Sequence, residues 1–288
     1  MPPRPSLRAL RAFAEVCRAG GVAPAARALG VSPSAVSHLL RELERTLGVA
    51  LFAAPGRPGA PLTEAGERLR AGLGSAFDGI DAAVAEAVRR SGEVRVSALS
   101  TFSELWLVPR LGRLRSALPE LRLLLAAETR MVDLATEPYD CAIRNGRGAY
   151  PGLEVTALFR ERLVAVANPR LLGEAGCLER LPRIAARSRP KDWPHVLRAL
   201  GLPPELPPAM VLETRALAVR AALAGLGAAV IDRHLVEDLI AARMLAVTPP
   251  DTGVDLPDGF FFVARAEKLR DKYVRGLRDW LAAEAAAR

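Results

Sequence analysis

The chain has few cysteines and no long apolar run. Its three cysteines, Cys17, Cys141 and Cys177, are scattered over 288 residues and show no metal-ligand spacing. This pattern favours buried thiols in a reducing compartment. No uninterrupted apolar run reaches the roughly 18 residues that a membrane-spanning helix needs, and the first residues lack the pattern of a secretory signal. We therefore expect a cytoplasmic protein with no membrane partner and no bound metal.

Lysine is also scarce, since only three of the 40 basic residues are lysines. The net charge is nevertheless +8, because arginine is abundant. A positive charge permits a polyanionic partner without specifying one. Residues 1–66 hold eight arginines and four glutamates, so half of the excess charge lies in less than a quarter of the chain. The charge signal is weak by itself, because such arginine richness is more simply explained by genome base composition than by function.

Residue patterns that support catalysis are missing. His38, His195 and His234 lie far apart and have no metal-ligand spacing. Ser100-Thr101 lacks the context of a nucleophile elbow. Gly146-Arg147-Gly148 lacks the third glycine and the following helix of a dinucleotide-binding loop. We expect neither an enzyme nor a cofactor.

What the sequence does contain is a helix-turn-helix pattern over residues 25–52. Gly30 interrupts a series of apolar residues spaced mostly three or four apart, which predicts two short amphipathic helices joined by a turn. Ser32 suits the N-cap of the second helix and Pro33 its first position. The outward face of this helix carries Ser34, Ser37, His38 and Arg41. Small hydroxyl groups beside a basic residue suit a helix that enters a DNA major groove.

The flanking segments extend this pattern to a winged fold. An amphipathic helix is predicted from Leu7 to the pair Gly20-Gly21, where it would complete a three-helix core. Residues 49–52 and 60–62 predict two short strands around a Pro/Gly-rich tip at 55–59. Arg57 in this tip is placed to touch DNA phosphates or the minor groove. The alternative is an ordinary surface hairpin with a solvated arginine.

A long helix is predicted from Thr63 to about Arg90. Its apolar residues recur at three- and four-residue steps: Leu69, Leu73, Ala76, Phe77, Ile80, Val84 and Ala87. We expect this seam to pair with the same helix of a second subunit, which would give a homodimer through residues 64–90. Packing against the C-terminal part of the same chain is the alternative.

Beyond Ser91-Gly92 the pattern changes to alternating strands and helices, which predicts an α/β fold. Strands are expected at 94–99, 121–127, 140–144, 163–167, 183–186, 228–231 and 260–264, and helices at 105–118, 216–224 and 268–286. Residues 92–160 and 266–288 are assigned to one lobe and residues 161–265 to a second, with a cleft between them.

Polar residues follow several of these strands, at the strand ends where open α/β sheets bind ligands. The candidate ligand-binding residues at strand ends are Ser100, Thr101, Phe102, Arg144, Asn145 and Asp232. Thr214, which precedes the predicted helix at 216–224, is a further candidate. An arginine with hydroxyl groups suggests a carboxylate ligand, such as an amino acid. The alternative for each residue is a solvated or helix-capping role.

The chain resembles the LysR-type transcriptional regulators. The resemblance rests on Ala25-Ala26, Leu29, Ser32, Ala35-Val36-Ser37, Leu40, Leu43-Glu44, Leu47-Gly48 and Leu51-Phe52 at fixed spacing, followed by Leu62-Thr63-Glu64-Ala65-Gly66. Residues 106–111, 142–148 and 151–153 are similar to the glycine-cleavage activator and β-lactamase activator branch.

This resemblance implies a winged helix-turn-helix at 1–62, a linker and dimerisation helix at 63–91, and an effector-binding domain at 92–288 like type 2 periplasmic solute-binding proteins. It also implies a homotetramer, double-stranded DNA with an interrupted inverted repeat as the target, RNA polymerase as a partner and a small effector in the cleft. The chain departs from the family at Ala54, where an arginine is usual, and at Gly21-Val22, where Ser-Phe is usual. The alternatives are an α/β solute-binding or enzymatic domain and a degenerate regulator without an effector.

Overall fold

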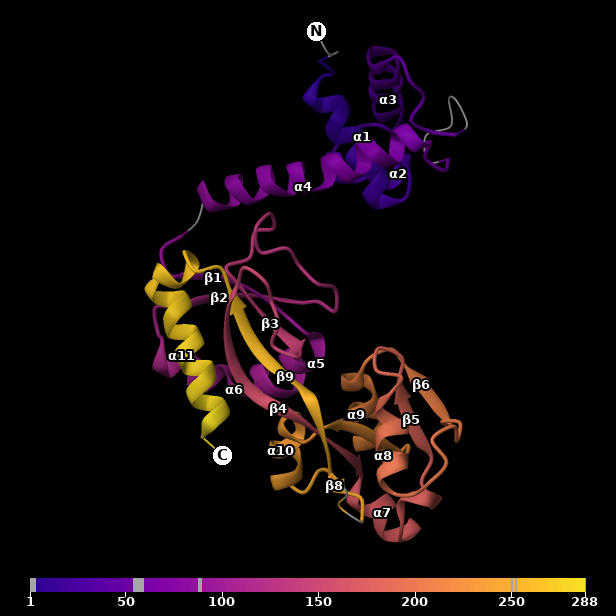
Figure 1. Ribbon diagram of the computed structural model, residues 1–288, viewed down its shortest axis with the longest axis vertical. Coiled ribbons are helices and arrows are strands. Elements are labelled where there is room, and N and C mark those ends of the chain that lie inside the picture. The colour runs from indigo at the N-terminus through magenta and orange to yellow at the C-terminus, as the bar shows by residue number, and fades with distance from the viewer. Residues whose placement is uncertain (1–3, 54–59, 88–89, 250, 252, 288) are drawn as a thin grey trace. The chain divides into compact units, whose positions relative to one another are not determined.

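The computed structural model describes residues 4–53, 60–87, 90–249, 251 and 253–287. The chain divides into two compact units, the first formed by residues 1–89 with 135–138 and the second by residues 90–134 with 139–288 (Figure 1).

The first unit is helical. Its helices are α1 (Leu7–Ala19), α2 (Val22–Leu29), α3 (Pro33–Leu47) and α4 (Glu64–Ala87). The first three enclose a core in which Phe13 meets Phe52 edge to face at 5.7 Å between ring centroids. Helices α2 and α3 end at Gly30 and Gly48, which adopt the left-handed conformation that glycine allows without strain. The predicted helix, turn and second helix are therefore present.

The predicted wing is smaller than expected in the part that the structure describes. Instead of two short strands there is one antiparallel bridge, between Phe52 and Leu62. Backbone hydrogen bonds still join the two segments, from the Ala53 N–H to the Pro61 carbonyl at 2.7 Å and from the Thr63 N–H to the Leu51 carbonyl at 3.0 Å. The hydroxyl of Thr63 also donates to the Ala50 carbonyl oxygen at 2.7 Å. The tip, including Ala54 and Arg57, lies outside the described residues.

The apolar seam of α4 falls into two halves. Leu69 and Leu73 pack against the core of the first unit, and the ring of Phe77 lies 5.0 Å below the Arg11 guanidinium. Farther along, Ile80 is 49% exposed and Val84 is 60% exposed. Only the second half of the described seam is therefore left uncovered by the first unit itself.

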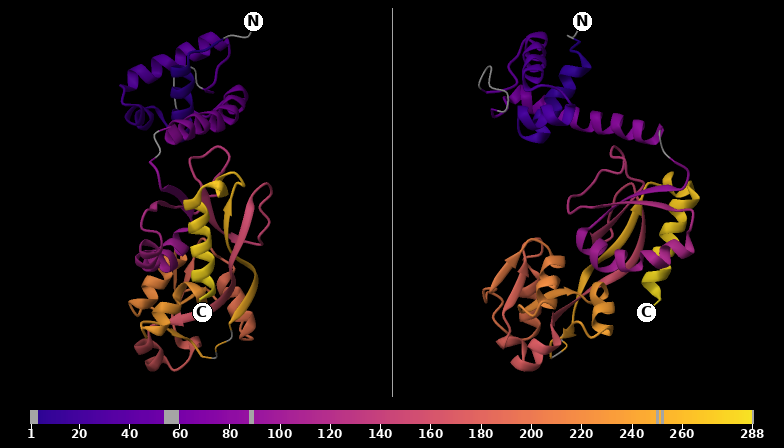
Figure 2. Two further views of the ribbon diagram at one scale, coloured as in Figure 1. Left: turned by 90° about the vertical axis from the view of Figure 1, so that its left-hand side faces the viewer. Right: turned by 180° about the vertical axis from the view of Figure 1, so that it is seen from behind.

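Among the described residues, the second unit builds one nine-stranded sheet with the order β2-β1-β3-β9-β4-β7-β5-β6, and β8 pairs with β4. The strands are β1 (Glu93–Ala98), β2 (Arg122–Ala127), β3 (Cys141–Gly146), β4 (Glu154–Ala167), β5 (Arg183–Ala186), β6 (Met210–Leu212), β7 (Ala228–Asp232), β8 (Ala246–Val247) and β9 (Val254–Ala264). Strands β4 and β9 are antiparallel and run through both halves of the unit, as the views in Figures 1 and 2 agree.

These two crossing strands define two lobes. The first lobe contains β1, β2 and β3, and the second contains β5, β6 and β7. Strand β9 pairs with β3 from Gly146↔Gly259 to Cys141↔Ala264, so residues 259–264 lie in the sheet of the first lobe. The assignment of all of residues 161–265 to the second lobe is therefore wrong at this strand.

One helical run follows β1 in the first lobe. It comprises α5 (Ser100–Phe102), the π-helical turn η1 (Ser103–Leu107) and α6 (Val108–Ala117). The helix thus begins at residue 100 rather than at the predicted 105, and Pro109 lies inside it. The N–H of Val108 donates to the Ser103 carbonyl, five residues back, and this wider turn directly precedes the proline that cannot donate.

The remaining helices cover the two lobes. They are α7 (Pro169–Ala175), the 3₁₀ turn η2 (Leu178–Arg180), α8 (Asp192–Ala199), α9 (Arg215–Leu223), α10 (Arg233–Ala241), the 3₁₀ turn η3 (Lys268–Arg270) and α11 (Lys272–Ala286). The predicted helix at 268–286 is divided, because Asp271 adopts an extended conformation and caps α11. No helix among the described residues is long and apolar enough to cross a membrane.

Candidate functional site

The N-terminus of α3 presents most of the residues predicted to contact DNA. The hydroxyl oxygen of Ser32 accepts the Ala35 N–H at 3.2 Å, and Pro33 occupies the first turn, as expected. Among the predicted contacts, the following side chains are exposed: Ser32, Pro33, Ser34, His38 and Arg41. Val36, Leu40 and Leu43 are buried on the other face of the helix. One side of α3 is thus polar and accessible, and the other is fixed in the core.

Ser37 is less available than the sequence predicts. It is half-buried, and its hydroxyl donates to the Pro33 carbonyl at 3.0 Å. Arg41 Nε donates to the Ser37 carbonyl at 3.3 Å. This contact holds the arginine stem along the helix and leaves the terminal guanidinium nitrogens beyond it.

Glu44 connects α3 to the segment that follows it. This role was not predicted from the sequence, because only the outward face of the helix was considered there. Oε1 of Glu44 accepts the N–H groups of Leu51 at 2.7 Å and Phe52 at 3.3 Å. The segment that leads to the predicted wing is therefore tied to the helix that carries the DNA-facing residues. A carboxylate that satisfies two backbone donors is worth more than an ordinary neutral hydrogen bond.

A cavity of about 240 Å³ lies between the two lobes of the second unit. It is lined by Leu99, Ser100, Thr101, Thr129, Met131, Arg144, Asn145, Ser188, Arg189, Thr214, Arg215 and Phe260. The first lobe supplies the ends of β1 and β3, and the second supplies the turn after β5 and the start of α9. These are the strand ends at which ligands bind in open α/β sheets.

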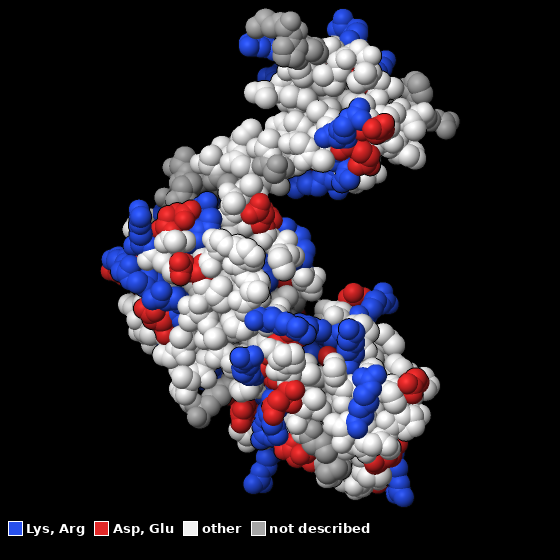
Figure 3. Space-filling view, viewed as in Figure 1, with Lys and Arg blue, Asp and Glu red and all other residues white. Residues whose placement is uncertain are grey.

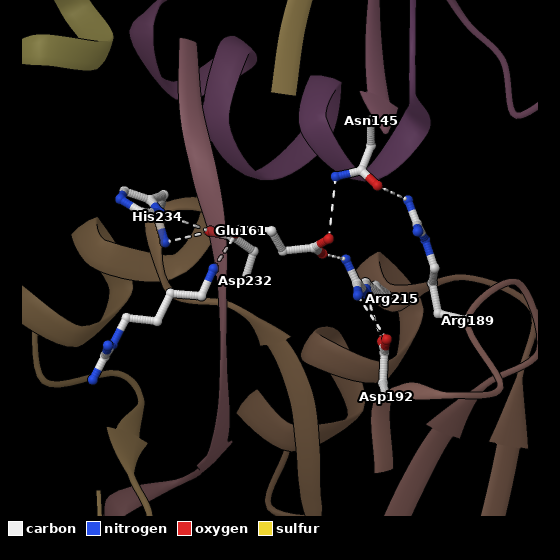
Figure 4. A network of polar contacts seen from close by, with 8 residues as sticks. Asn145, Glu161, Arg189, Asp192, Arg215, Asp232 and His234 are labelled. Carbon is white, nitrogen blue, oxygen red and sulfur yellow. Dashed lines mark hydrogen bonds and ion pairs between the residues drawn. The ribbon is translucent and has the colours of Figure 1, made fainter. Parts of the chain in front are cut away.

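A polar network joins the lobes and includes three of the lining residues, Asn145, Arg189 and Arg215 (Figure 4). The Arg215 guanidinium donates to Asp192 at 2.6 and 2.7 Å and to Glu161 Oε1 at 2.5 Å. Glu161 Oε2 accepts from Asn145 Nδ2 at 3.2 Å, and Asn145 Oδ1 accepts from Arg189 at 2.7 Å. Glu161 lies on crossing strand β4, so the network connects a first-lobe strand, a crossing strand and two second-lobe segments.

The two arginines of this network, Arg189 and Arg215, differ in the charge of their hydrogen-bond partners. Burial lowers the pKa of Arg215, but the hydrogen bonds and charges of Asp192 and Glu161 outweigh burial and raise the pKa above its ordinary value. For Arg189, burial and then the charge of Arg215 lower the pKa. Arg189 is thus a cation held next to a neutral amide, whereas Arg215 is enclosed by two carboxylates.

Five of the seven predicted ligand-binding residues line the cavity: Ser100, Thr101, Arg144, Asn145 and Thr214. Arg144 is 4% exposed, and its guanidinium donates to the Ser97 hydroxyl and to the Ser97 and Ile143 carbonyls. It therefore clamps β1 to β3, which makes it a less available anion partner than expected. Thr214 also caps α9, since its hydroxyl oxygen accepts the Leu217 N–H.

Phe102 and Asp232 are not among the lining residues. Phe102 is fully buried and stacks on Trp106 at 4.9 Å between centroids, because the helix starts at residue 100 and turns this side chain into the core. Asp232 is fully buried as well and caps α10 by accepting the His234 N–H at 2.7 Å. Burial raises the pKa of Asp232, and His234 opposes that rise.

Ser188 and Arg189 are the cavity residues that the sequence argument missed. They follow the predicted strand at 183–186, so the rule that selected Asn145 applies to them as well. Within the described part of the chain, no group of three histidine, cysteine, aspartate or glutamate residues could hold a metal ion.

Surface charge does not mark out a second site on the face seen in Figure 3. Basic and acidic side chains are interspersed over that face of the second unit. The net positive charge therefore gives no large patch of one sign there.

Comparison with known proteins identifies a matching family for both parts of the chain. Residues 7–67 match the family described as "Bacterial regulatory helix-turn-helix protein, lysR family", and residues 87–286 match the "LysR substrate binding domain". The chain is 35% identical to the HTH-type transcriptional regulator TrpI of Pseudomonas aeruginosa, over 96% of each chain. It is 31% identical to the glycine cleavage system transcriptional activator of Escherichia coli K12, over 98% of this chain and 95% of that one.

A solved structure agrees with these matches. The effector domain of the transcriptional regulator AmpR of Pseudomonas aeruginosa superposes with a TM-score of 0.57 at 28% identity, covering 68% of this chain and 96% of that domain.

Proposed function

The chain belongs to the LysR family of transcriptional regulators, and on that premise we propose that it binds a specific operator through α3 under the control of a small anionic effector. The observation that carries the proposal is the exposed polar face of α3, opposite a buried apolar face in the same helix.

The DNA contacts follow from the side chains on that face. Ser34, His38 and Arg41 reach toward base edges, and Ser32, Pro33 and Ser37 lie at or near the helix entry. Arg41 is the strongest candidate for sequence readout, because a guanidinium pairs with the O6 and N7 atoms of guanine. Arg57 would contact the DNA backbone or the minor groove, in place of the arginine that the family usually has where this chain has Ala54.

The effector would bind in the cavity between the lobes. Hydroxyl groups of Ser100, Thr101 and Thr214 surround it, and Asn145 and Arg144 lie in its wall. Such a lining suits a small molecule with a carboxylate. Because residues from both lobes line the cavity, a ligand there would change how the lobes are held together.

The assembly is also a proposal. We place the DNA-binding domain at residues 1–62, the linker helix at 63–91 and the effector domain at 92–288. Pairing through residues 64–90 would give a homodimer, and two dimers a homotetramer that reads an interrupted inverted repeat. Because its target is DNA, the protein would act in the cytoplasm, and RNA polymerase would be its partner at the promoter.

DNA binding can be measured by fluorescence anisotropy with the region upstream of the gene and a random duplex of equal length. We expect tighter binding to the upstream region and a steep loss of affinity with salt, because phosphate contacts release counterions. Arg41→Ala should weaken specific binding at least tenfold and leave the random duplex less affected, with Arg68→Ala on α4 as the control. Equal affinity for both duplexes would contradict the proposal.

A further inference from the structure

The wall of the interlobe cavity is basic and hydroxylic. The described residues that line it include three arginines, four side-chain hydroxyls from Ser100, Thr101, Ser188 and Thr214, and no aspartate or glutamate. Arg144 and Arg215 already donate to protein acceptors, so a ligand in this cavity meets mainly the hydroxyl groups and the guanidinium of Arg189, and it meets no carboxylate from the described lining.

The two carboxylates of the network, those of Asp192 and Glu161, already accept hydrogen bonds from other side chains of the protein. Both oxygens of Asp192 accept from Arg215, Glu161 Oε1 accepts from Arg215, and Glu161 Oε2 accepts from Asn145. Glu161 is 1% exposed and Asp192 is 6% exposed, and neither lines the cavity. A ligand ammonium group would have to separate one of them from Arg215, which would leave a buried guanidinium short of a partner.

Arg189 is differently placed. It lines the cavity, and its one hydrogen bond among the described residues goes to the amide oxygen of Asn145 from the other lobe. No described carboxylate lies within ion-pair distance of it. An anion is a stronger acceptor for a guanidinium than an amide oxygen is, so a ligand carboxylate or phosphate can replace Asn145 as the partner of Arg189.

We propose that the effector is an organic anion without an ammonium group, a carboxylate or phosphate ester, whose charge is received by Arg189 at the boundary between the lobes. This inference rests on the effector-controlled function proposed above and narrows its ligand class. It excludes free α-amino acids, because their ammonium group would face arginines and committed carboxylates. Release of Asn145 from Arg189 is the change by which such a ligand alters the contact between the lobes.

The test compares pairs of ligands that carry either an oxo group or an ammonium group on the same carbon atom. Thermal-shift and calorimetric titrations of the full-length protein would use pyruvate against alanine, 2-oxoglutarate against glutamate and phenylpyruvate against phenylalanine, with inorganic phosphate as a further arm. We expect at least one oxoacid to bind at least tenfold more tightly than its amino acid. If phosphate stabilises the protein more than any of the three oxoacids does, the effector is assigned to the phosphate esters and not to the carboxylates.

Three variants locate the binding. Arg189→Gln should weaken the anion at least tenfold, and Arg189→Lys should retain part of the affinity because the charge remains. Arg187→Gln is the matched control, since Arg187 is largely exposed and pairs with Glu213 outside the cavity lining.

Three results would overturn the inference: tighter binding of an amino acid than of its oxoacid, no binding by any of the four anions, or unchanged binding in Arg189→Gln. DNA affinity of the same samples is measured in parallel. If specific DNA binding persists while the ligand ranking reverses, the ligand class is wrong and the regulator function stands; if specific DNA binding is absent, the regulator function itself fails.

Discussion

Arg215 is nearly fully buried, and its surroundings decide what its charge can do. Its guanidinium contacts Asp192 at the start of α8 and Glu161 on β4, so three elements meet at one side chain. An isolated charge in such a place would be strongly unfavourable, whereas a paired and hydrogen-bonded one is tolerated. Arg215 therefore has a structural role at the cavity wall.

Replacing Glu161 with glutamine tests this role. Gln keeps the size of the side chain but leaves Arg215 with one charged partner, so we expect the free energy of unfolding to fall by about 3 kcal/mol. Urea denaturation followed by tryptophan fluorescence would measure it, because all three tryptophans lie beyond residue 92. In the control Glu213→Gln, an exposed ion pair is lost and the change should stay below about 1 kcal/mol. Equal effects of the two substitutions would contradict the account.

Sequence reasoning at this scale succeeded where a residue follows a strand directly. Asn145 was chosen on that basis and lines the cavity, as does Thr214, which was chosen because it precedes the predicted helix at 216–224. It failed for Phe102, because the direction of that side chain depends on where the helix starts, and for Asp232, because helix capping and ligand binding favour the same residue type. Glu161 lies within a strand, so no strand-end rule could select it.

Near its start, helix α4 lies unusually close to the backbone of the segment that follows α3. A Cβ atom on Gly66 would lie 2.2 Å from the Leu51 carbonyl oxygen, well inside any real contact distance. The N–H of Gly66 also donates to Thr63 Oγ1 at 3.0 Å. The helix can thus start against the segment after α3 only when residue 66 has no side chain.

Two alanine substitutions in α4 separate this contact from helix propensity. Gly66→Ala should destabilise the first unit by about 2 kcal/mol or more, as expected for overpacking against backbone. Gly72→Ala has open space around its added Cβ and should instead stabilise the helix by about 0.5–1 kcal/mol. Hydrogen exchange of peptides from α1 and α3 would detect the first effect. Similar protection in wild type and Gly66→Ala would show that the backbone shifts at no cost.

The regular elements were predictable to different degrees. Helices α1 and α3 have apolar spacing and capping residues that agree, and their bounds were predicted closely. Helix α2 has no side-chain cap and starts at Val22, before the predicted stretch that begins at residue 25. Strands β4 and β9 were only half predicted, because their outer parts carry charged residues, Pro257 and Gly259, and β4 contains irregularities between Ala157 and Arg162. Pairing with a neighbouring strand, which a single segment does not reveal, extends both of them.

At the scale of the whole molecule, the proposed pairing of subunits would use the exposed end of the α4 seam. Ile80 and Val84 remain largely exposed, whereas Leu69 and Leu73 pack within their own unit. Arg11 pairs with Asp81 through two hydrogen bonds of 2.8 and 3.0 Å, which fixes this end of α4 against α1. The helix would then offer a fixed apolar surface to a second copy.

The double substitution Ile80→Asp with Val84→Asp should raise the dissociation constant of the dimer at least tenfold, because charges would be buried at the interface. Sedimentation velocity over a concentration series would measure it. Ala71→Asp, on the opposite face of α4 by helical periodicity, is the control and should leave the dimer intact. A dimer unaffected by the double substitution would place subunit pairing elsewhere.

Selection of genomic DNA fragments by the purified full-length protein, compared with Arg41→Ala, would show whether α3 reads a DNA sequence. We expect the wild-type protein to enrich one sequence pattern, an interrupted inverted repeat present upstream of a small number of genes, and Arg41→Ala to lose or alter the base preference within each half of it. Enrichment of no pattern by the wild-type protein, or of the same pattern with the same base preferences by both proteins, would contradict this expectation.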